Sequence, residues 1–292
     1  TQPSKAIRKG RCSVGNTMAG MSISEMEEMA RKCRVEICKM THRAQAGHPG
    51  GSLSEIDILC GLYGHRLRVK PDDPDWEDRD RFILSKGHAS PGMYAVLAEM
   101  GFISHEDLKS YRVKGGVCQG HVDMKWCPGV DFSAGSLGMG LSFGMGCAVA
   151  AKLDGSSRNA YVMVGDGEIQ EGSVWEAAMA ATHHELGNLK LFVDCNGIQN
   201  DDFCEAQMRM FDIPAKWNAF GWAVKIIDGH DMTSIVEAID WMDTIQDKPA
   251  VVIAQTIKGK GVSFMENNPA FHGAAPSDEQ LAQALSELGV EA

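Results

Sequence analysis

Short apolar runs separated by helical patterns constrain the fold of this chain more than any other feature. The runs span residues 82–85, 160–165, 189–194, 223–228 and 250–256. Helical patterns near 171–186 and 233–246 lie between later runs, whereas 205–220 is looser. Strands that alternate with helices predict an α/β fold: a mostly parallel sheet that is flanked by helices on both faces.

The first half of the chain predicts further helices. One spans 24–46, with Ser24 as its N-terminal cap. A second spans 53–65 and follows "GHPGGSLS" (47–54), which we interpret as a turn. These helices are expected to pack around the sheet.

An uncharged stretch, "FSAGSLGMGLSFGMGCAVAA" (132–151), mimics a membrane span. It carries five glycines, and its first part reads as a loop. About a dozen residues remain for a helix, which is too few to cross a bilayer. Gly140 and Gly144 form a GxxxG pattern. We therefore expect a buried helix near 137–153, packed closely on another helix, and no membrane association.

Composition limits the functions that are open to the chain. The net charge is −11, from 28 basic and 39 acidic residues, which argues against nucleic-acid binding. The nine cysteines include no CxxC pair, so reduced thiols in the cytoplasm are favoured over a disulfide or zinc framework. The N-terminus has no apolar core and is no secretory signal. Without an internal linker, we expect an extension at 1–24 and one domain at 25–292.

The stretch "YVMVGDGEIQEG" (161–172) places Asp166 between two glycines at the end of a predicted strand. Asp194 ends the next predicted strand, and Asn196 follows it. Because carboxylate and amide oxygens suit Mg²⁺ or Ca²⁺, a cation that bridges a bound diphosphate is expected here. Gly165 and Gly167 would let the backbone turn tightly and bring an N–H close to the anion. The alternative is an aspartate that caps the next helix.

Asn196 lies 30 residues after Asp166, about one strand–helix–strand unit. This arrangement resembles the thiamine diphosphate signature. Six motifs occur in the order and spacing of transketolases: "GHPGGSLS", "RDRFILSKGHAS", "SAGSLGMGLS", "GDGEIQEGSVWEAAM", "DCNGIQND" and "TIKGKGVSFMENNPAFHGAAP". The resemblance covers residues 25 to 275 and implies the thiamine diphosphate-binding fold, as the diphosphate-binding domain.

The resemblance implies a role for each matching position. Asp166, Asn196 and the Ile198 carbonyl would hold Mg²⁺, with Ca²⁺ or Mn²⁺ as substitutes; the asparagine more usual before the ligand is Cys195 here. Further cofactor-binding positions are Gly165, Gly167 (through its N–H), Gly135, Leu137, His88 and Glu171. Glu171 matches a carboxylate near the family's subunit contact. Its alternative is a solvated glutamate in the first turn of a helix.

Four histidines in glycine-rich loops match active-site positions of the family: His48, His88, His121 and His272. The resemblance places His88 near the diphosphate, His121 near the donor sugar's hydroxyls, and the other two near the reacting oxygen. Imidazoles can donate to a developing alkoxide and move protons near neutral pH. Many transketolases have a further histidine where this chain has Pro269, which leaves two roles open for His272. The remaining histidines, including His183 and His184, are interpreted as surface residues.

The matched region corresponds only to the N-terminal part of a transketolase. The pyrimidine-binding and C-terminal domains, including the glutamate that activates the cofactor, have no counterpart here. We therefore expect the N-terminal subunit of a split transketolase, active with a C-terminal partner in an α2β2 assembly and inactive alone. The reaction implied is ketol transfer from a ketose or its phosphate to an aldose or its phosphate. A natural subunit is expected, with an expression fragment as the alternative.

Three other functions stay open. The chain could be the α subunit of a 2-oxo acid dehydrogenase, although "GHPGGSLS" and "RDRFILSKGHAS" have no place there. It could be a 1-deoxyxylulose 5-phosphate synthase, although "QEGSVWEAAM" and "AGSLGMG" favour transketolase. It could also be a non-catalytic paralogue that regulates a full-length enzyme. The motifs leave open which ketose and aldose are used.

Overall fold

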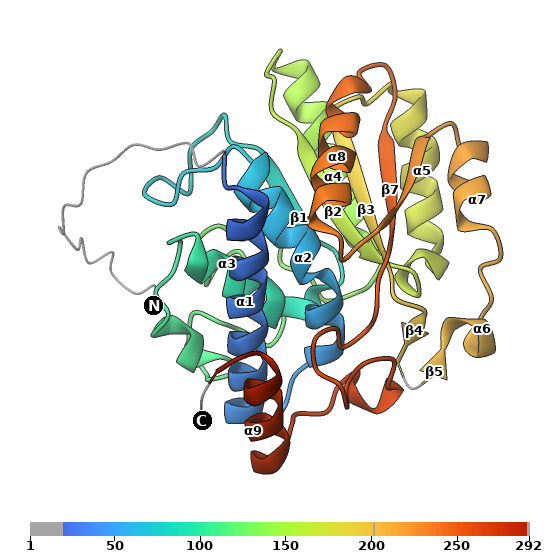
Figure 1. Ribbon diagram of the computed structural model, residues 1–292. Coiled ribbons are helices and arrows are strands. Elements are labelled where there is room, and N and C mark those ends of the chain that lie inside the picture. Colours follow the sequence, from blue (N-terminus) through green and yellow to red (C-terminus); the bar gives the residue numbers. More distant parts are fainter. Residues whose placement is uncertain (1–19, 201, 291–292) are drawn as a thin grey trace.

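A computed structural model describes residues 20–200 and 202–290 of the chain (Figure 1). Most of the predicted extension at 1–24 therefore lies outside the described residues, as does Cys12. The eight cysteines within the described part are free thiols. No helix in that part is long and apolar enough to cross a membrane.

The main sheet consists of five parallel strands in the spatial order β1-β2-β3-β7-β6. They are β1 (Arg81–Leu84), β2 (Ala160–Gly165), β3 (Leu189–Cys195), β6 (Ala223–Asp228) and β7 (Ala250–Gln255). At the end of β3, Asp194 lies opposite Gly165 of β2 and Ala254 of β7. The predicted α/β fold with a mostly parallel sheet is confirmed, and the strand ends differ from those predicted by at most one residue.

Helices cover both faces of the sheet because successive strand residues point to opposite sides. Tyr161 and Met163 of β2 join one apolar core, and Val162 and Val164 join the other. The first core also contains residues of α1 (Ile23–Ala44), α2 (Pro49–His65), α3 (Ser90–Glu99), α8 (Met232–Thr244) and α9 (Asp278–Glu287). The second contains residues of α4 (Met139–Leu153), α5 (Gly172–His183) and α7 (Ile213–Ala219). Figure 1 shows α1, α2 and α3 side by side, with α9 beside α1.

Several helix boundaries differ from the prediction. The N-cap of α1 is Ser22, not Ser24, because Ser22 and Glu25 form a capping box. Helix α2 begins at Pro49, so most of the predicted turn at 47–54 is the beginning of this helix. The looser stretch contains α7 and a short α6 (Cys204–Gln207), beside a small hairpin of β4 (Ile198–Gln199) and β5 (Asp202–Phe203).

The uncharged helix α4 packs on another helix, α5, as expected, but Gly140 and Gly144 do not lie in that contact. A Cβ atom at Gly140 would lie 2.4 Å from the Ser85 Cβ, and one at Gly144 would lie 2.3 Å from the Val162 Cγ2. Gly140 and Gly144 of α4 therefore face the sheet. The opposite face exposes an apolar row, which we call the α4 stripe: Met139, Phe143, Gly146, Ala150 and Leu153.

We predict opposite effects on stability when a methyl group is added to the two faces of α4. We expect Gly144→Ala to destabilise the fold by about 1–3 kcal/mol, because the methyl group would collide with Val162 in a packed core. Gly146→Ala, where a Cβ meets nothing within 4 Å, should stabilise it by up to about 1 kcal/mol. Urea denaturation measures both, and equal effects would contradict this packing of α4.

Candidate functional site

A cavity of about 410 Å³ opens where the loops leave the carboxyl ends of the sheet strands. Every site residue predicted from the sequence lines it: His48, His88, His121, Gly135, Leu137, Gly165, Asp166, Gly167, Glu171, Asn196, Ile198 and His272. The structure thus brings together residues that are up to 224 positions apart in the chain. It also adds residues that the prediction missed: Gly51, Lys86, Glu168, Gln170, Gln199, Asn200 and Lys258.

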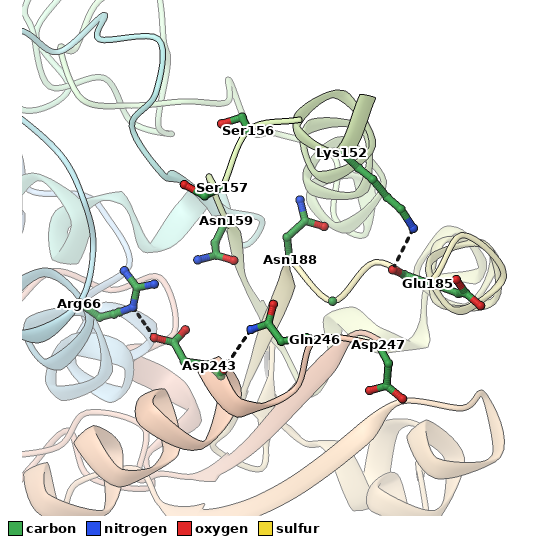
Figure 2. Close-up of a pocket in the computed structure, with 11 residues that line it drawn as sticks. Arg66, Lys152, Ser156, Ser157, Asn159, Glu185, Asn188, Asp243, Gln246 and Asp247 are labelled. Carbon is green, nitrogen blue, oxygen red and sulfur yellow. Dashed lines mark hydrogen bonds and ion pairs between the residues drawn. The ribbon is translucent and has the colours of Figure 1, made fainter. Parts of the chain in front are cut away.

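A larger cavity, of about 680 Å³, lies at the opposite end of the strands (Figure 2). Its two cations already have partners. Arg66 Nε lies 2.5 Å from Asp243 Oδ2, and Lys152 Nζ donates to the carbonyls of His184 and Glu185 at 2.8 and 3.3 Å. Each cation of this cavity is therefore already held by a carboxylate or by backbone carbonyls.

Asp166 ties together the loops that follow β2 and β3. Its Oδ1 accepts the Gly167 N–H at 2.8 Å, and its Oδ2 accepts the Gly197 N–H at 2.6 Å. Burial outweighs these bonds and raises its pKa to about 6. The alternative of a helix cap does not hold, because the N-caps of the next two helical segments are Gly167 and Glu171.

Asn196 and Ile198 present two further oxygens. The Asn196 Nδ2 donates to Asp194 Oδ2 at 3.1 Å and to Ser54 Oγ at 3.2 Å, which fixes the orientation of the amide. The Ile198 carbonyl accepts the Lys258 ammonium at 2.9 Å, so a cationic group already contacts one proposed ligand. A carboxylate, an amide oxygen and a carbonyl form a hard donor set that fits Mg²⁺ or Ca²⁺. Residues 20–200 and 202–290 hold no cluster of three His, Cys, Asp or Glu side chains that could bind a metal by themselves.

The two lysines that the prediction missed are buried. Lys86 donates to the Gly51 carbonyl at 3.0 Å and contacts the carboxylates of Asp194 and Glu55. Burial opposes its charge, but the two carboxylates outweigh burial and raise its pKa. The pKa of Lys258 is lowered to about 8 by burial and by the charge of Lys86. Lys86 follows the end of β1, and Lys258 follows the end of β7. This position after a strand is the sequence signal by which both lysines could have been predicted as site residues.

Glu168 fastens the start of α4 to the end of β2. Its Oε1 accepts the Gly138 N–H at 2.9 Å and its Oε2 accepts the Gly165 N–H at 3.0 Å. The expected turn follows Gly165, at Asp166 and Gly167, but neither glycine has a positive φ, so the turn itself does not require glycine. A Cβ at Gly167 would instead lie 2.7 Å from the Gln199 Cβ. An anion at the Gly167 N–H would have to compete with Asp166 for it.

The four predicted histidines form one cluster. The ring centre of His48 lies 5.0 Å from that of His88, 5.4 Å from that of His272 and 6.3 Å from that of His121. Burial, together with neighbouring positive groups, lowers the pKa of His48 to about 4 and that of His272 to about 3. It also lowers the pKa of His88 and of His121. All four are therefore neutral near pH 7, when each imidazole carries one N–H donor and one acceptor.

His48 and His272 are each held next to a short local element. His48 precedes Pro49, the first residue of α2, and its Nδ1 is buried without a hydrogen-bond partner. Pro269 begins the 3₁₀ turn Pro269–Phe271, which His272 follows directly. The His272 Nδ1 lies 2.7 Å from Lys258 Nζ, which points its ring toward the cavity lysine.

The remaining predicted positions lie at the mouth of the cavity. A Cβ at Gly135 would meet nothing within 4 Å, so the backbone there is open to a ligand. Glu171 is exposed at the N-cap of α5 and makes no capping bond. This position fits both the predicted subunit contact and a solvated glutamate near the helix dipole.

The histidines outside the site were interpreted as surface residues. His183 and His184 are exposed, which confirms that interpretation for them. It is wrong for His230, whose side chain is only 11% exposed and contacts Asp57.

Comparisons with known proteins agree with this geometry. Residues 25–292 match the family model described as "Transketolase, thiamine diphosphate binding domain". The chain is 38% identical to an apulose-4-phosphate transketolase subunit of Phocaeicola vulgatus, over 92% of this chain and 95% of that protein. It is 40% identical to the 6-deoxy-6-sulfo-D-fructose transketolase subunit SqwG of a Clostridium species, over 84% and 89%.

Solved structures show the same fold. The transketolase of Campylobacter jejuni superimposes with a TM-score of 0.88 at 32% identity, over 93% of this chain and 44% of that one. A transketolase variant of Pichia stipitis superimposes with a TM-score of 0.87 at 31% identity, over 93% and 41%. The chain thus spans about two fifths of the length of these solved proteins.

Proposed function

This chain belongs to the transketolase family, and from that premise we propose that it acts as the N-terminal, thiamine diphosphate-binding subunit of a split transketolase. The reaction would transfer a two-carbon ketol unit from a ketose or its phosphate to an aldose or its phosphate. The observation that carries the proposal is the single cavity that gathers three hard oxygen donors, two buried lysines and four neutral histidines. When bound, thiamine diphosphate supplies a nucleophilic carbon and an electron sink for the two-carbon unit.

Asp166, Asn196 and the Ile198 carbonyl would hold Mg²⁺, for which Ca²⁺ or Mn²⁺ could substitute. Lys258 Nζ already donates to the Ile198 carbonyl, so a bound cation would have to share this oxygen with the lysine. The raised pKa of Asp166 supports the assignment. A buried carboxylate that is costly to ionise gains most from a bound cation.

The diphosphate would meet Lys258 and the neutral ring of His88. Lys86 already faces two carboxylates, whereas no carboxylate among the described residues lies within ion-pair distance of Lys258. Lys258 is therefore the lysine whose positive charge is not already neutralised by a carboxylate and can bind an anion. Binding a diphosphate would favour its protonated form, which burial alone disfavours.

The histidine cluster would serve the sugar. His48 offers a buried Nδ1 without a protein partner, so a substrate hydroxyl could satisfy it. Neutral imidazoles can donate an N–H to a developing alkoxide and accept a proton in return. His121, at the exposed edge of the cluster, would contact the donor's hydroxyls, while His48 and His272 face the reacting oxygen.

A partner subunit would complete the site. Relatives of matching length are named as subunits of transketolases, and the solved transketolases are more than twice as long as this chain. The partner would supply the pyrimidine-binding and C-terminal domains and the glutamate that activates the cofactor, in an α2β2 assembly. The α4 stripe, which begins two residues after the cavity residue Leu137, supports a covering partner there.

The proposal places the protein in cytoplasmic carbohydrate metabolism of the pentose phosphate type. A 2-oxo acid dehydrogenase or 1-deoxyxylulose 5-phosphate synthase is disfavoured by relatives that are named as transketolases. A non-catalytic paralogue is disfavoured because the metal ligands and all four histidines converge in one cavity.

The test is a ketol-transfer assay of this chain with and without the product of the adjacent reading frame. We expect no turnover by the isolated chain. The co-purified complex should turn over, and chelation of divalent ions or removal of thiamine diphosphate should abolish that activity. Turnover by the chain alone, or turnover that needs neither cofactor, would disprove the proposal.

A further inference from the structure

His230 lies behind the loop that carries Lys258 into the cavity. Its Nε2 accepts the Ile257 N–H at 2.8 Å, and its Nδ1 lies 2.7 Å from Asp57 Oδ2. An acceptor at Nε2 requires a lone pair there, so the proton of the neutral ring sits on Nδ1 and is donated to Asp57. The two bonds thus assign the tautomer, and a second proton on the ring would break the bond to Ile257.

Asp57 and Arg34 extend this contact to the other side of Lys258. Arg34 Nη2 lies 2.5 Å from Asp57 Oδ2, and its Nε donates to the Lys260 carbonyl at 3.1 Å. Burial opposes ionisation of Asp57, but the bonds to His230 and Arg34 outweigh it and lower its pKa. The backbone is therefore held just before Lys258, through the Ile257 N–H, and two residues after it, through the Lys260 carbonyl.

The loop separates two cavities. On one side, Lys258 reaches the Ile198 carbonyl and His272 in the candidate site. On the other side, a cavity of about 510 Å³ is lined by Arg34, Asp57 and His230. Because Ile257 directly precedes Lys258 in the chain, a shift of its backbone would move Lys258 as well.

We propose that His230 is a positioning residue: its Nε2 holds the Ile257 N–H and thereby places the Lys258 ammonium in the cavity. Asp57 and Arg34 orient the ring for this bond. The inference rests on the proposed function only where it assigns a diphosphate to Lys258. If His230 served only as a hydrogen-bond donor to the buried Asp57, loss of the Nδ1 bond would have a larger effect than loss of the Nε2 bond.

Two variants separate these roles because each keeps one bond. In His230→Gln, the Oε1 atom replaces Nε2 and can accept the Ile257 N–H, while the donor to Asp57 is lost. In His230→Asn, the Nδ2 atom replaces Nδ1 and can donate to Asp57, while the acceptor for Ile257 is lost. A thermal melt of each variant confirms that it folds.

The measurements are amide hydrogen exchange at Ile257 and calorimetric titration of the full chain with inorganic pyrophosphate and Mg²⁺. We expect His230→Asn to speed Ile257 exchange and weaken pyrophosphate binding by about tenfold each, the typical effect of one lost buried hydrogen bond. His230→Gln should stay within about threefold of the wild type in both. The reverse order, or equal behaviour of the two variants, would overturn the inference. A wild type that fails to bind pyrophosphate would count against the proposed function, and the exchange rates would still decide the role of His230.

Discussion

Replacing Asp166 with asparagine is expected to raise the Mg²⁺ concentration needed for half-maximal activity of the reconstituted enzyme by about 10²- to 10³-fold. Asp166 is the only carboxylate in the proposed ligand set, so the variant leaves the cation with neutral oxygens alone. Its pKa is raised to about 6 by burial. The metal-free fold therefore loses stability as the pH rises from 3.8, the ordinary pKa of the group, to about 6, and it bears the full cost of the ionised carboxylate above that pH. A bound cation removes this cost, and asparagine cannot benefit in the same way.

The matched control is Glu168→Gln. Glu168 is a buried carboxylate two residues away that lines the same cavity, but it accepts hydrogen bonds from Gly138, Gly165 and Ser85. We expect this variant to lower the free energy of unfolding by about 1–3 kcal/mol, since an amide leaves one donor unpaired. Its Mg²⁺ requirement should stay within about threefold of the wild type. Equal Mg²⁺ requirements in both variants would mean that Asp166 is no ligand.

The sheet and the location of the site could be predicted because both depend on local patterns. Strands such as β2 read as short apolar runs, and in a parallel sheet polar residues after such runs must gather at one edge. Asp166, Asn196 and Ile198 follow that rule, and all lie in one cavity. The histidines came from the resemblance to transketolases, since loop positions such as His121 carry no periodic signal.

The buried charges could not be predicted, because their partners are distant in the sequence. Lys86 contacts Asp194, 108 residues away, and Lys190 points into the core to donate to the Ile245 carbonyl at 2.8 Å. A lysine in a strand or a loop is expected to be exposed to solvent unless such a partner is known. His230 was misread for the same reason, since Asp57 lies 173 residues before it. The glycines of α4 indicated a close approach, but not that the sheet makes it.

A negative charge at the cavity end of the α4 stripe should block assembly with the partner subunit. We expect Met139→Glu to weaken association by 10²-fold or more, about 3 kcal/mol, because the partner would bury an unpaired carboxylate. Met139 is 46% exposed at the first position of α4, where a carboxylate is favourable to the helix dipole. The isolated chain should therefore lose little stability, within about 0.5 kcal/mol by urea denaturation. Analytical ultracentrifugation of the mixed subunits measures the association.

Leu153→Glu provides the comparison, because it places the same charge on the same stripe at the far end of α4. Leu153 is 82% exposed and lies on the side of the other, polar cavity, beside Lys152. If the partner covers the candidate site, this variant should assemble as the wild type does and retain ketol transfer. Loss of assembly in Leu153→Glu alone would mean that the partner binds at the end of the sheet with the polar cavity, away from the candidate site. Full assembly in Met139→Glu would mean that the cavity is closed without contact to α4, and the partner surface would have to be sought on the His121 side of the cavity.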